Sequence, residues 1–253
     1  MPDWKPEQYL KFAAERTQPC RDLVSRIAIP NPRRVIDLGC GPGNSSEVLA
    51  ARWPEAELTG LDSSAEMIAK ARGAHPAWCW LSGDIAEWTN GQDSFDVVFC
   101  NAAMQWVPDH QDAFPRLLAR VAPGGALAVQ MPANFEAEAH TLMRAVASHF
   151  PDTHSVREWF THDTGFYYDT LAHLAARLEL WSTEYIHIMD GPESIVEWYS
   201  GSGMRPFLDA LLTDSDRQRF TTEYLEAVRE AYSARRDGRV LFPFRRLFIV
   251  AYR

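Results

Sequence analysis

The stretch that decides the fold is VIDLGCGPGN, Val35–Asn44, an apolar run that ends in three glycines. A helical pattern follows it at once. Glycine N–H groups at a strand-to-helix turn can approach a polar ligand closely, because no Cβ stands in the way. The stretch therefore predicts a buried strand that delivers a tight turn to a nucleotide-like cofactor.

The spacing of the glycines narrows the kind of cofactor. Gly39, Gly41 and Gly43 give the pattern G-x-G-x-G, whereas the dinucleotide fingerprint G-x-G-x-x-G would need a glycine where this chain has Asn44. Nicotinamide binding is therefore less favoured. The residues that end the following strands must decide the identity of the cofactor.

Length and charge limit the class of protein. The chain has 253 residues, enough for one large α/β domain with additions. It carries 25 Lys and Arg against 34 Asp and Glu, and its net charge of −9 opposes attraction to a phosphate backbone. We therefore expect no nucleic-acid partner. No apolar stretch reaches about 20 residues, so we also expect no membrane span.

Cysteine usage favours a reducing compartment. The four cysteines lie far apart in the sequence, without a C-x-x-C pair, and no secretory leader pattern opens the chain. We expect a reduced, cytoplasmic protein that acts as a monomer. These cysteines are interpreted as small apolar filler of the core: Cys20, Cys40, Cys79 and Cys100.

Strands and helices alternate along the chain. Parallel neighbours need helical crossovers, so the alternation predicts an α/β fold with a doubly wound parallel sheet. After the strand before the glycines we expect six more, at Glu57–Leu61, Trp78–Leu81, Phe95–Asn101, Ala126–Met131, Leu178–Met189 and Leu247–Tyr252. The expected helical segments are two short helices in 4–28 broken near Pro19, then 45–53, a capped helix from Ser63 to Arg72, one ending at 117–121, 134–166 and 191–237.

Polar residues follow three of the predicted strands. Asp62, Asp84 and Asn101 stand at or just beyond strand ends, where open α/β sheets bind their ligands. Asp62 comes 23 residues after Gly39, a position from which a carboxylate can accept hydrogen bonds from both hydroxyls of a ribose. The three side chains together predict a nucleoside-containing cofactor at this edge.

These motifs resemble those of the class I S-adenosylmethionine-dependent methyltransferases, over about residues 30–131. The motifs that carry the resemblance are Asp37–Gly43, Leu61-Asp62, Gly83-Asp84-Ile85 and Ala122–Gly125. The resemblance implies a seven-stranded Rossmann-like sheet whose last strand is antiparallel. Stretches outside the cofactor motifs also resemble members of this family that methylate a small polycarboxylate. These stretches are 15–19, 105–110, 129–132, 196–198, 203–208 and 238–241.

The resemblance also implies how S-adenosylmethionine is bound. The glycines would let the backbone approach the methionine part, Asp62 would hold the ribose, and Asp84 with Ile85 would read the adenine. Arg16 and Asn101 would hold the carboxylate and amino groups of the methionine. The full expected set of cofactor residues is Arg16, Asp37, Gly39, Gly41, Asn44, Asp62, Ser63, Met67, Asp84, Ile85 and Asn101.

The chemistry of a carboxylate acceptor makes few demands on the protein. Methyl transfer from a sulfonium is an in-line displacement, in which the enzyme mainly positions the reactants. A carboxylic acid with a pKa near 4 is ionised at pH 7, so we expect no general base. We also expect no metal, because no His or Cys cluster has ligand spacing.

A polycarboxylate acceptor needs cationic and hydrogen-bonding side chains, preferably arginine. Arg205 is the first candidate, because it lies near Gly201 and Gly203 in an expected turn. The full set of acceptor candidates is Tyr9, Gln105, Trp106, His110, Trp198, Tyr199, Arg205 and Arg245. By resemblance, one methyltransferase domain, 1–253, has a core at 30–131, 167–189 and 240–253 and a helical substrate cap at 1–28, 134–166 and 190–238.

Two alternatives stay open at this point. The acceptor could be a malonyl group on acyl carrier protein or another small acid, and a protein substrate of that kind would call for a basic docking face. The chain could also be a non-catalytic cofactor-binding interaction module, because a fold does not fix a function.

Overall fold

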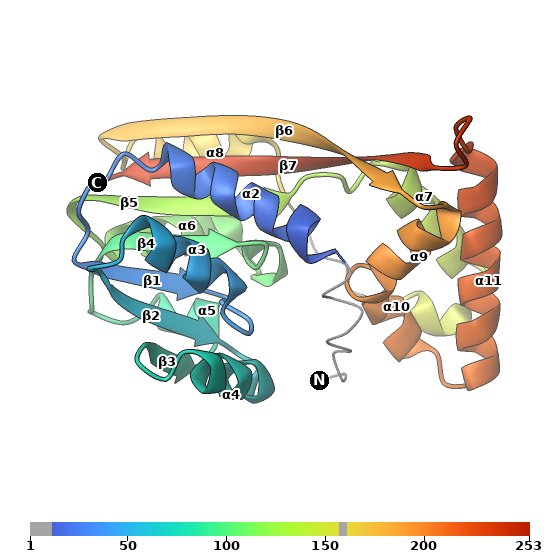
Figure 1. Cartoon of the computed structure of the whole chain (residues 1–253), viewed down its shortest axis with the longest axis horizontal. Coiled ribbons are helices and arrows are strands. Elements are labelled where there is room, and N and C mark those ends of the chain that lie inside the picture. Colours follow the sequence, from blue (N-terminus) through green and yellow to red (C-terminus); the bar gives the residue numbers. More distant parts are fainter. Residues whose placement is uncertain (1–11, 157–160) are drawn as a thin grey trace. The chain divides into compact units, whose positions relative to one another are not determined.

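A seven-stranded sheet with the order β3-β2-β1-β4-β5-β7-β6 dominates the structure, a computed structural model that describes residues 12–156 and 161–253 (Figure 1). Strands β1 to β5 pair in parallel and β7 is antiparallel to β5, which confirms the expected sheet. The strands are β1 (Arg34–Leu38), β2 (Glu57–Asp62), β3 (Cys79–Ser82), β4 (Phe95–Asn101), β5 (Val121–Pro132), β6 (Arg177–Met189) and β7 (Val240–Tyr252).

The chain divides into two compact units. The sheet unit comprises residues 16–132, 161–183 and 246–253, and the described part of the helical unit comprises 12–15, 133–156 and 184–245. Residues 16–26 belong to the sheet unit, although the sequence assigns them to the cap. Action of the helical unit as a substrate cap stays a prediction.

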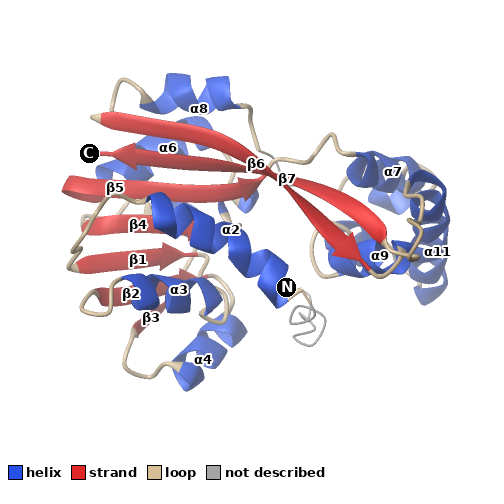
Figure 2. Ribbon diagram, turned by 45° about the horizontal axis from the view of Figure 1, so that its top comes forward, coloured by secondary structure: helices blue, strands red, loops and turns tan. Residues whose placement is uncertain are grey.

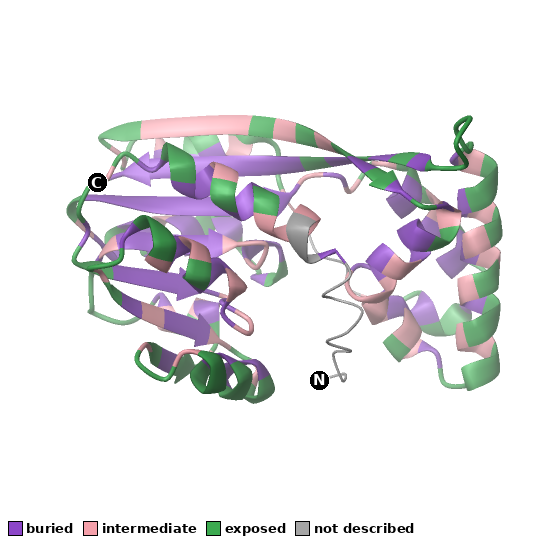
Figure 3. Ribbon diagram, viewed as in Figure 1, coloured by how far each residue is buried: buried purple, intermediate pink, exposed green. Residues whose placement is uncertain are grey.

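Helices cover both faces of the sheet. Figure 2 shows α2 and α3 on one face, and α6 and α8 on the other. Buried on both sides, β1 and β4 are continuously apolar except at Asp37 and near their ends (Figure 3). The helices of this unit are α2 (Ala13–Arg26, which belongs to it from Arg16 on), α3 (Asn44–Arg52), α4 (Ala65–Ala74), α5 (Ile85–Trp88), η1 (Met104–Trp106), α6 (His110–Ala119) and α8 (Thr164–Leu171).

Two local predictions in the sheet unit are wrong. Helix α2 runs unbroken through Pro19, which removes only one N–H donor from a helix whose Leu23 and Val24 side chains are buried. The expected capping box at Ser63 is also displaced, because Ser64 caps α4 by accepting a hydrogen bond from the Met67 N–H.

The helical unit has a core of its own. Its elements are α7 (Glu138–Ala147), η2 (Pro151–Thr153), α9 (Pro192–Ser200), α10 (Arg205–Ala210) and α11 (Asp214–Ala231). They bury an aromatic cluster that includes Trp198, Tyr199, Phe220 and Phe242. The expected continuous helical stretch over 134–166 is only partly correct, because non-helical segments separate its helices.

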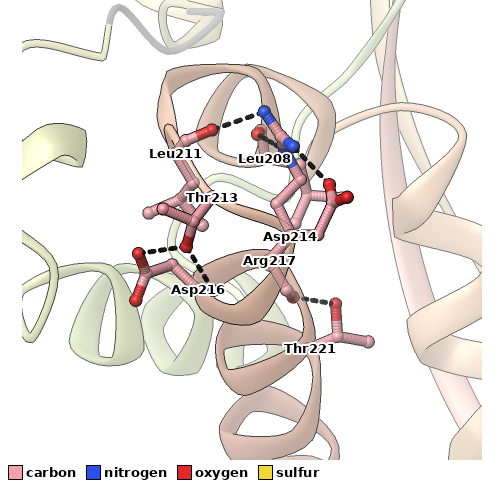
Figure 4. Close-up of polar contacts among 7 residues, drawn as sticks. All are labelled: Leu208, Leu211, Thr213, Asp214, Asp216, Arg217 and Thr221. Carbon is pink, nitrogen blue, oxygen red and sulfur yellow. Dashed lines mark hydrogen bonds and ion pairs between the residues drawn. The ribbon is translucent and has the colours of Figure 1, made fainter.

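One arginine joins the last two helices of this unit. Arg217 on α11 donates to the carbonyls of Leu208 and Leu211 at the end of α10, and it pairs with Asp214 at 2.7 Å (Figure 4). Thr213 caps α11 by accepting from the Asp216 N–H at 3.0 Å. These bonds satisfy the backbone groups that the sharp turn between the helices leaves unpaired.

Gly60 in β2 is required by close packing and not by its backbone conformation. A Cβ there would overlap the Trp80 ring and lie 2.9 Å from Cys40 Sγ. We expect Gly60→Ala to lower the free energy of unfolding by about 1–3 kcal/mol in urea denaturation. The control is Gly73→Ala in α4, where a Cβ meets no atom within 4 Å and should leave stability unchanged or slightly raised. Equal effects of the two substitutions would contradict this packing.

Candidate active site

The Gly-rich loop between β1 and α3 has an open backbone. Gly39, Gly41 and Gly43 have φ values of 71°, 55° and 104°, a region that favours glycine. A Cβ on Gly39 would overlap the Cβ of Ala103, whereas a Cβ on Gly41 would meet no atom within 4 Å. The loop therefore offers a cradle in which a ligand can approach the backbone.

The end of β2 holds this loop in place. The N–H groups of Gly39 and Cys40 both donate to the Leu61 carbonyl, at 2.7 and 3.0 Å. Asp62 accepts from the Gly41 N–H through Oδ2 at 2.9 Å and from the Ser64 N–H through Oδ1 at 2.8 Å. Each carboxylate oxygen can accept a second hydrogen bond, so Asp62 can also receive two ribose hydroxyls.

Asp37 is a fully buried carboxylate beneath the loop. Its Oδ2 accepts from the hydroxyls of Ser45 and Ser46 on α3, at 2.6 and 2.7 Å. Its Oδ1 has no hydrogen-bond partner in the described part of the chain. Burial raises the pKa of Asp37 to about 6, against the two serine bonds that lower it. At pH 7 the carboxyl group of Asp37 is therefore mostly ionised, and its Oδ1 can accept a hydrogen bond from a ligand.

The end of β4 supplies a second buried acceptor. The Oδ1 of Asn101 is buried and has no hydrogen-bond partner among residues 12–156 and 161–253. Ala102 follows with a φ of 56°, and its N–H donates to the carbonyl of Gln130 at 2.9 Å. A left-handed alanine is unfavourable and persists only where its surroundings hold it.

The other expected cofactor residues lie around this edge of the sheet unit. Ile85 is close to Gly39, since its Cδ1 is 3.7 Å from the position of a Gly39 Cβ. Asp84 is exposed and caps α5 by accepting from the Ala86 N–H at 2.7 Å. Met67 is buried on α4, Ser63 is exposed, and both Arg16 on α2 and Asn44 on α3 are half-buried.

Three acceptor candidates follow β4. Gln105 is buried and donates to the Ala102 carbonyl at 2.7 Å, and Trp106 is 49% exposed. Burial lowers the pKa of His110, so the ring is neutral at pH 7. Its Nε2 lies 2.8 Å from the Met104 carbonyl and its Nδ1 lies 2.7 Å from the Tyr167 hydroxyl. Both ring nitrogens of His110 are therefore engaged within the protein, so contact with a substrate would require breaking one of these two hydrogen bonds.

The remaining candidates belong to the helical unit or lie outside the described residues. Trp198 and Tyr199 are buried in its aromatic core, and the Tyr199 hydroxyl accepts from Asn134 at 3.1 Å. Arg205 is half-buried and lies 3.4 Å from Asp209. Arg245 is exposed on β7. The expected acceptor residue Tyr9 lies outside the described residues.

The structure adds residues that the sequence analysis did not single out. Ser45 and Ser46 hold Asp37, and Gln130 and Arg246 are buried polar residues of the sheet. A signal for Arg246 was present in the sequence. Phe242 and Phe244 alternate with exposed residues along β7, which puts Arg246 and not Arg245 on the buried side.

Neither a metal site nor a membrane-spanning helix is found in the described part of the chain. Residues 12–156 and 161–253 contain no group of three or more His, Cys, Asp or Glu arranged to hold a metal ion. In the same residues, no helix is both long and apolar enough to cross a membrane.

The chain is similar to known methyltransferases over its whole length. A family model described as a methyltransferase domain matches residues 12–177. A trans-aconitate 2-methyltransferase of Rhodopseudomonas palustris is 46% identical over 99% of both chains. Proteins of the same name are 45% identical in Azoarcus, over all of both chains, and 43% identical in Escherichia coli, over 100% of this chain and 99% of the relative.

Solved structures show the same fold at low sequence identity. The YcgJ protein of Bacillus subtilis aligns with a TM-score of 0.62 at 14% identity, covering 92% of this chain and 97% of its own. A Haemonchus contortus N-methyltransferase in complex with S-adenosylhomocysteine aligns with a TM-score of 0.56 at 15% identity, over 92% of this chain and 52% of its own. The chain therefore belongs to the S-adenosylmethionine-dependent methyltransferases, in the family of the trans-aconitate 2-methyltransferases.

Proposed function

We propose that this chain transfers the methyl group of S-adenosylmethionine to one carboxylate of trans-aconitate, forming a monomethyl ester. The observation that carries the proposal is the 46% identity to a trans-aconitate 2-methyltransferase over 99% of both chains. This similarity spans the helical unit as well as the sheet unit. It therefore bears on the acceptor and not only on the cofactor, whose motifs lie in the sheet unit.

The residues of the sheet unit fit the cofactor. The open backbone at Gly41 suits the close approach of a ligand, and the Asp62 carboxylate retains acceptor positions for a ribose. Asp37 and Asn101 offer buried acceptor atoms that suit the ammonium group of an amino acid. When bound, the cofactor supplies an electrophilic methyl group on a positively charged sulfur.

The acceptor needs to be positioned and not deprotonated. A carboxylate is already ionised at pH 7, so we assign no general base and no metal to the reaction. The protein must hold the other carboxylates of the acceptor, although its own net charge is −9. We assign this task to the acceptor candidates, with Arg205 first, and we assign a covering role to the helical unit.

The experiment that tests the proposal is a turnover screen with S-adenosylmethionine and identification of the product by mass. The acceptors are trans-aconitate, cis-aconitate, citrate, isocitrate and malonyl-acyl carrier protein. We expect esterification of trans-aconitate, seen as the gain of one CH2. Reaction of the acyl carrier protein substrate alone, or cofactor binding without any turnover, would overturn the proposed acceptor.

The proposal includes the state of the protein in the cell. We assign it to the cytoplasm, because all four cysteines are free, and we assign it a monomeric state. Light scattering of the purified chain measures the oligomeric state directly.

We expect Arg205→Ala to raise the KM for trans-aconitate about 10–100-fold, the range for losing a charged hydrogen bond. The dissociation constant of S-adenosylhomocysteine should stay within about twofold, because Arg205 has no assigned role in cofactor binding. The matched control is Arg219→Ala on α11, which removes an exposed arginine that pairs with Glu223. Initial-rate kinetics and calorimetric titration give the two constants. An unchanged KM would remove Arg205 from the acceptor site.

We expect Asp37→Asn to stabilise the protein more at pH 8 than at pH 5. The folded-state pKa is raised from 3.8 to about 6, so ionising Asp37 costs the folded state up to about 3 kcal/mol above pH 6. At pH 5 Asp37 is mostly protonated, and the advantage of the variant should shrink by about 1.4 kcal/mol.

Urea denaturation at the two pH values measures this difference, with Asp169→Asn on the exposed side of α8 as the control. The Asp37 variant should also bind S-adenosylhomocysteine more weakly, because it lacks the charge assigned to the ammonium group. A stability difference independent of pH would show that Asp37 does not titrate as described.

A further inference from the structure

Gln130 is a fully buried glutamine in β5 whose polar groups are only partly used. Its backbone carbonyl accepts from the Ala102 N–H at 2.9 Å, and its Oε1 accepts from Arg246 Nη1 at 3.4 Å. Because arginine can only donate, the amide oxygen must face Arg246. The atom that remains is Nε2, which has no hydrogen-bond partner in the described part of the chain.

Sheet register places Gln130 beside Asn101 and on the same face as Asp37, and each of these two residues has a buried acceptor atom without a hydrogen-bond partner in the described part of the chain. Gln130 is the partner of Asn101 on β4, and Phe99, two residues earlier on β4, is the partner of Asp37 on β1. Registered partners on neighbouring strands point to the same face of a sheet, and so do residues two apart. Asp37, Asn101 and Gln130 therefore form one polar row on the same face of the sheet, which runs diagonally across three strands.

Neighbouring contacts identify the face that carries this polar row. Asp37 bonds to serines of α3, and Phe248, the partner of Gln130 on β7, stacks on Trp181 with 4.8 Å between the ring centroids. Arg26 of α2 lies 4.4 Å from the centre of the Trp181 ring. The polar row therefore lies on the face that α2 and α3 cover, as Figure 1 shows for these two helices.

The three unused atoms of the polar row have complementary chemistry. Asp37 Oδ1 and Asn101 Oδ1 are buried acceptors, and Gln130 Nε2 is a buried donor. Buried polar groups are nearly always satisfied, so such atoms mark a place where a ligand supplies the missing bonds. The amino-acid end of S-adenosylmethionine has an ammonium group that donates and a carboxylate that accepts, so it can satisfy both kinds.

We propose that Gln130 is a cofactor-binding residue that donates from Nε2 to the carboxylate of the methionyl end, with its amide oriented by Arg246. The inference rests on the proposed roles of Asp37 and Asn101 at the ammonium group. It does not depend on the identity of the methyl acceptor. The proposal adds β5 to the strands whose residues are assigned to the cofactor.

The test compares two ligands that differ in the proposed contact. S-adenosylhomocysteine carries the amino-acid end, and 5′-methylthioadenosine lacks it but keeps the adenosine. Calorimetric titration of Gln130→Leu should show at least tenfold weaker binding of S-adenosylhomocysteine. Binding of 5′-methylthioadenosine should stay within twofold of the unsubstituted protein. The control is Gln18→Leu on α2, an exposed glutamine that bonds to Asp22.

The outcomes separate a binding role from a structural one. An equal loss for both ligands means that Gln130 only supports the fold, and no loss for either ligand means that it does not touch the cofactor; both results overturn the proposal. If Gln130→Leu fails to fold, Gln130→Glu keeps the shape and replaces the donor by a negative charge. It should also weaken S-adenosylhomocysteine selectively. No acceptor is used, so a failed trans-aconitate screen leaves this test intact.

Discussion

The hydrogen bonds between the Gly-rich loop and the end of β2 are the constraint that fixes the edge of the sheet proposed to bind the cofactor. Two loop N–H groups share the Leu61 carbonyl, and a third bonds to the Asp62 carboxylate. These bonds hold the backbone in its left-handed turns and fix the carboxylate that is assigned to the ribose. Under the proposed role, the Asp62 side chain both holds the loop and binds the ribose. Neighbouring Gly60 packs so closely against the Trp80 ring that a Cβ would not fit there.

Behind the loop, the sheet unit keeps polar groups in a buried environment where they are unfavourable. Asp37 is ionised at neutral pH despite complete burial, and the two serine hydroxyls of α3 offset only part of that cost. Asn101 and Gln130 keep buried atoms without partners. A cofactor with an ammonium and a carboxylate group would satisfy such atoms. Because these buried polar atoms destabilise the folded protein when they lack partners, a ligand with matching charged groups would be favoured over one without them.

Binding the methyl acceptor requires polar side chains that are not already fully engaged in the fold. His110 and Gln105 shape the segment after β4 through bonds to backbone carbonyls, and only Trp106 of that group is well exposed. In the helical unit, Trp198 and Tyr199 fill the aromatic core, while Arg205 stays half-buried beside Asp209. A half-buried arginine with a weak partner can exchange it for a carboxylate of the acceptor. This environment supports the choice of Arg205 that the sequence made from its position near two glycines.

The sequence by itself determined the succession of strands and helices along the chain, the Gly-rich turn and the residues at the strand ends, because these depend on local patterns of glycine, apolar and acidic residues. Only the tertiary structure decided that helix α2 continues through Pro19. It also decided that Gln130 lies beside Asn101. These outcomes depend on sheet register and on packing between segments far apart in the chain, which no local pattern contains.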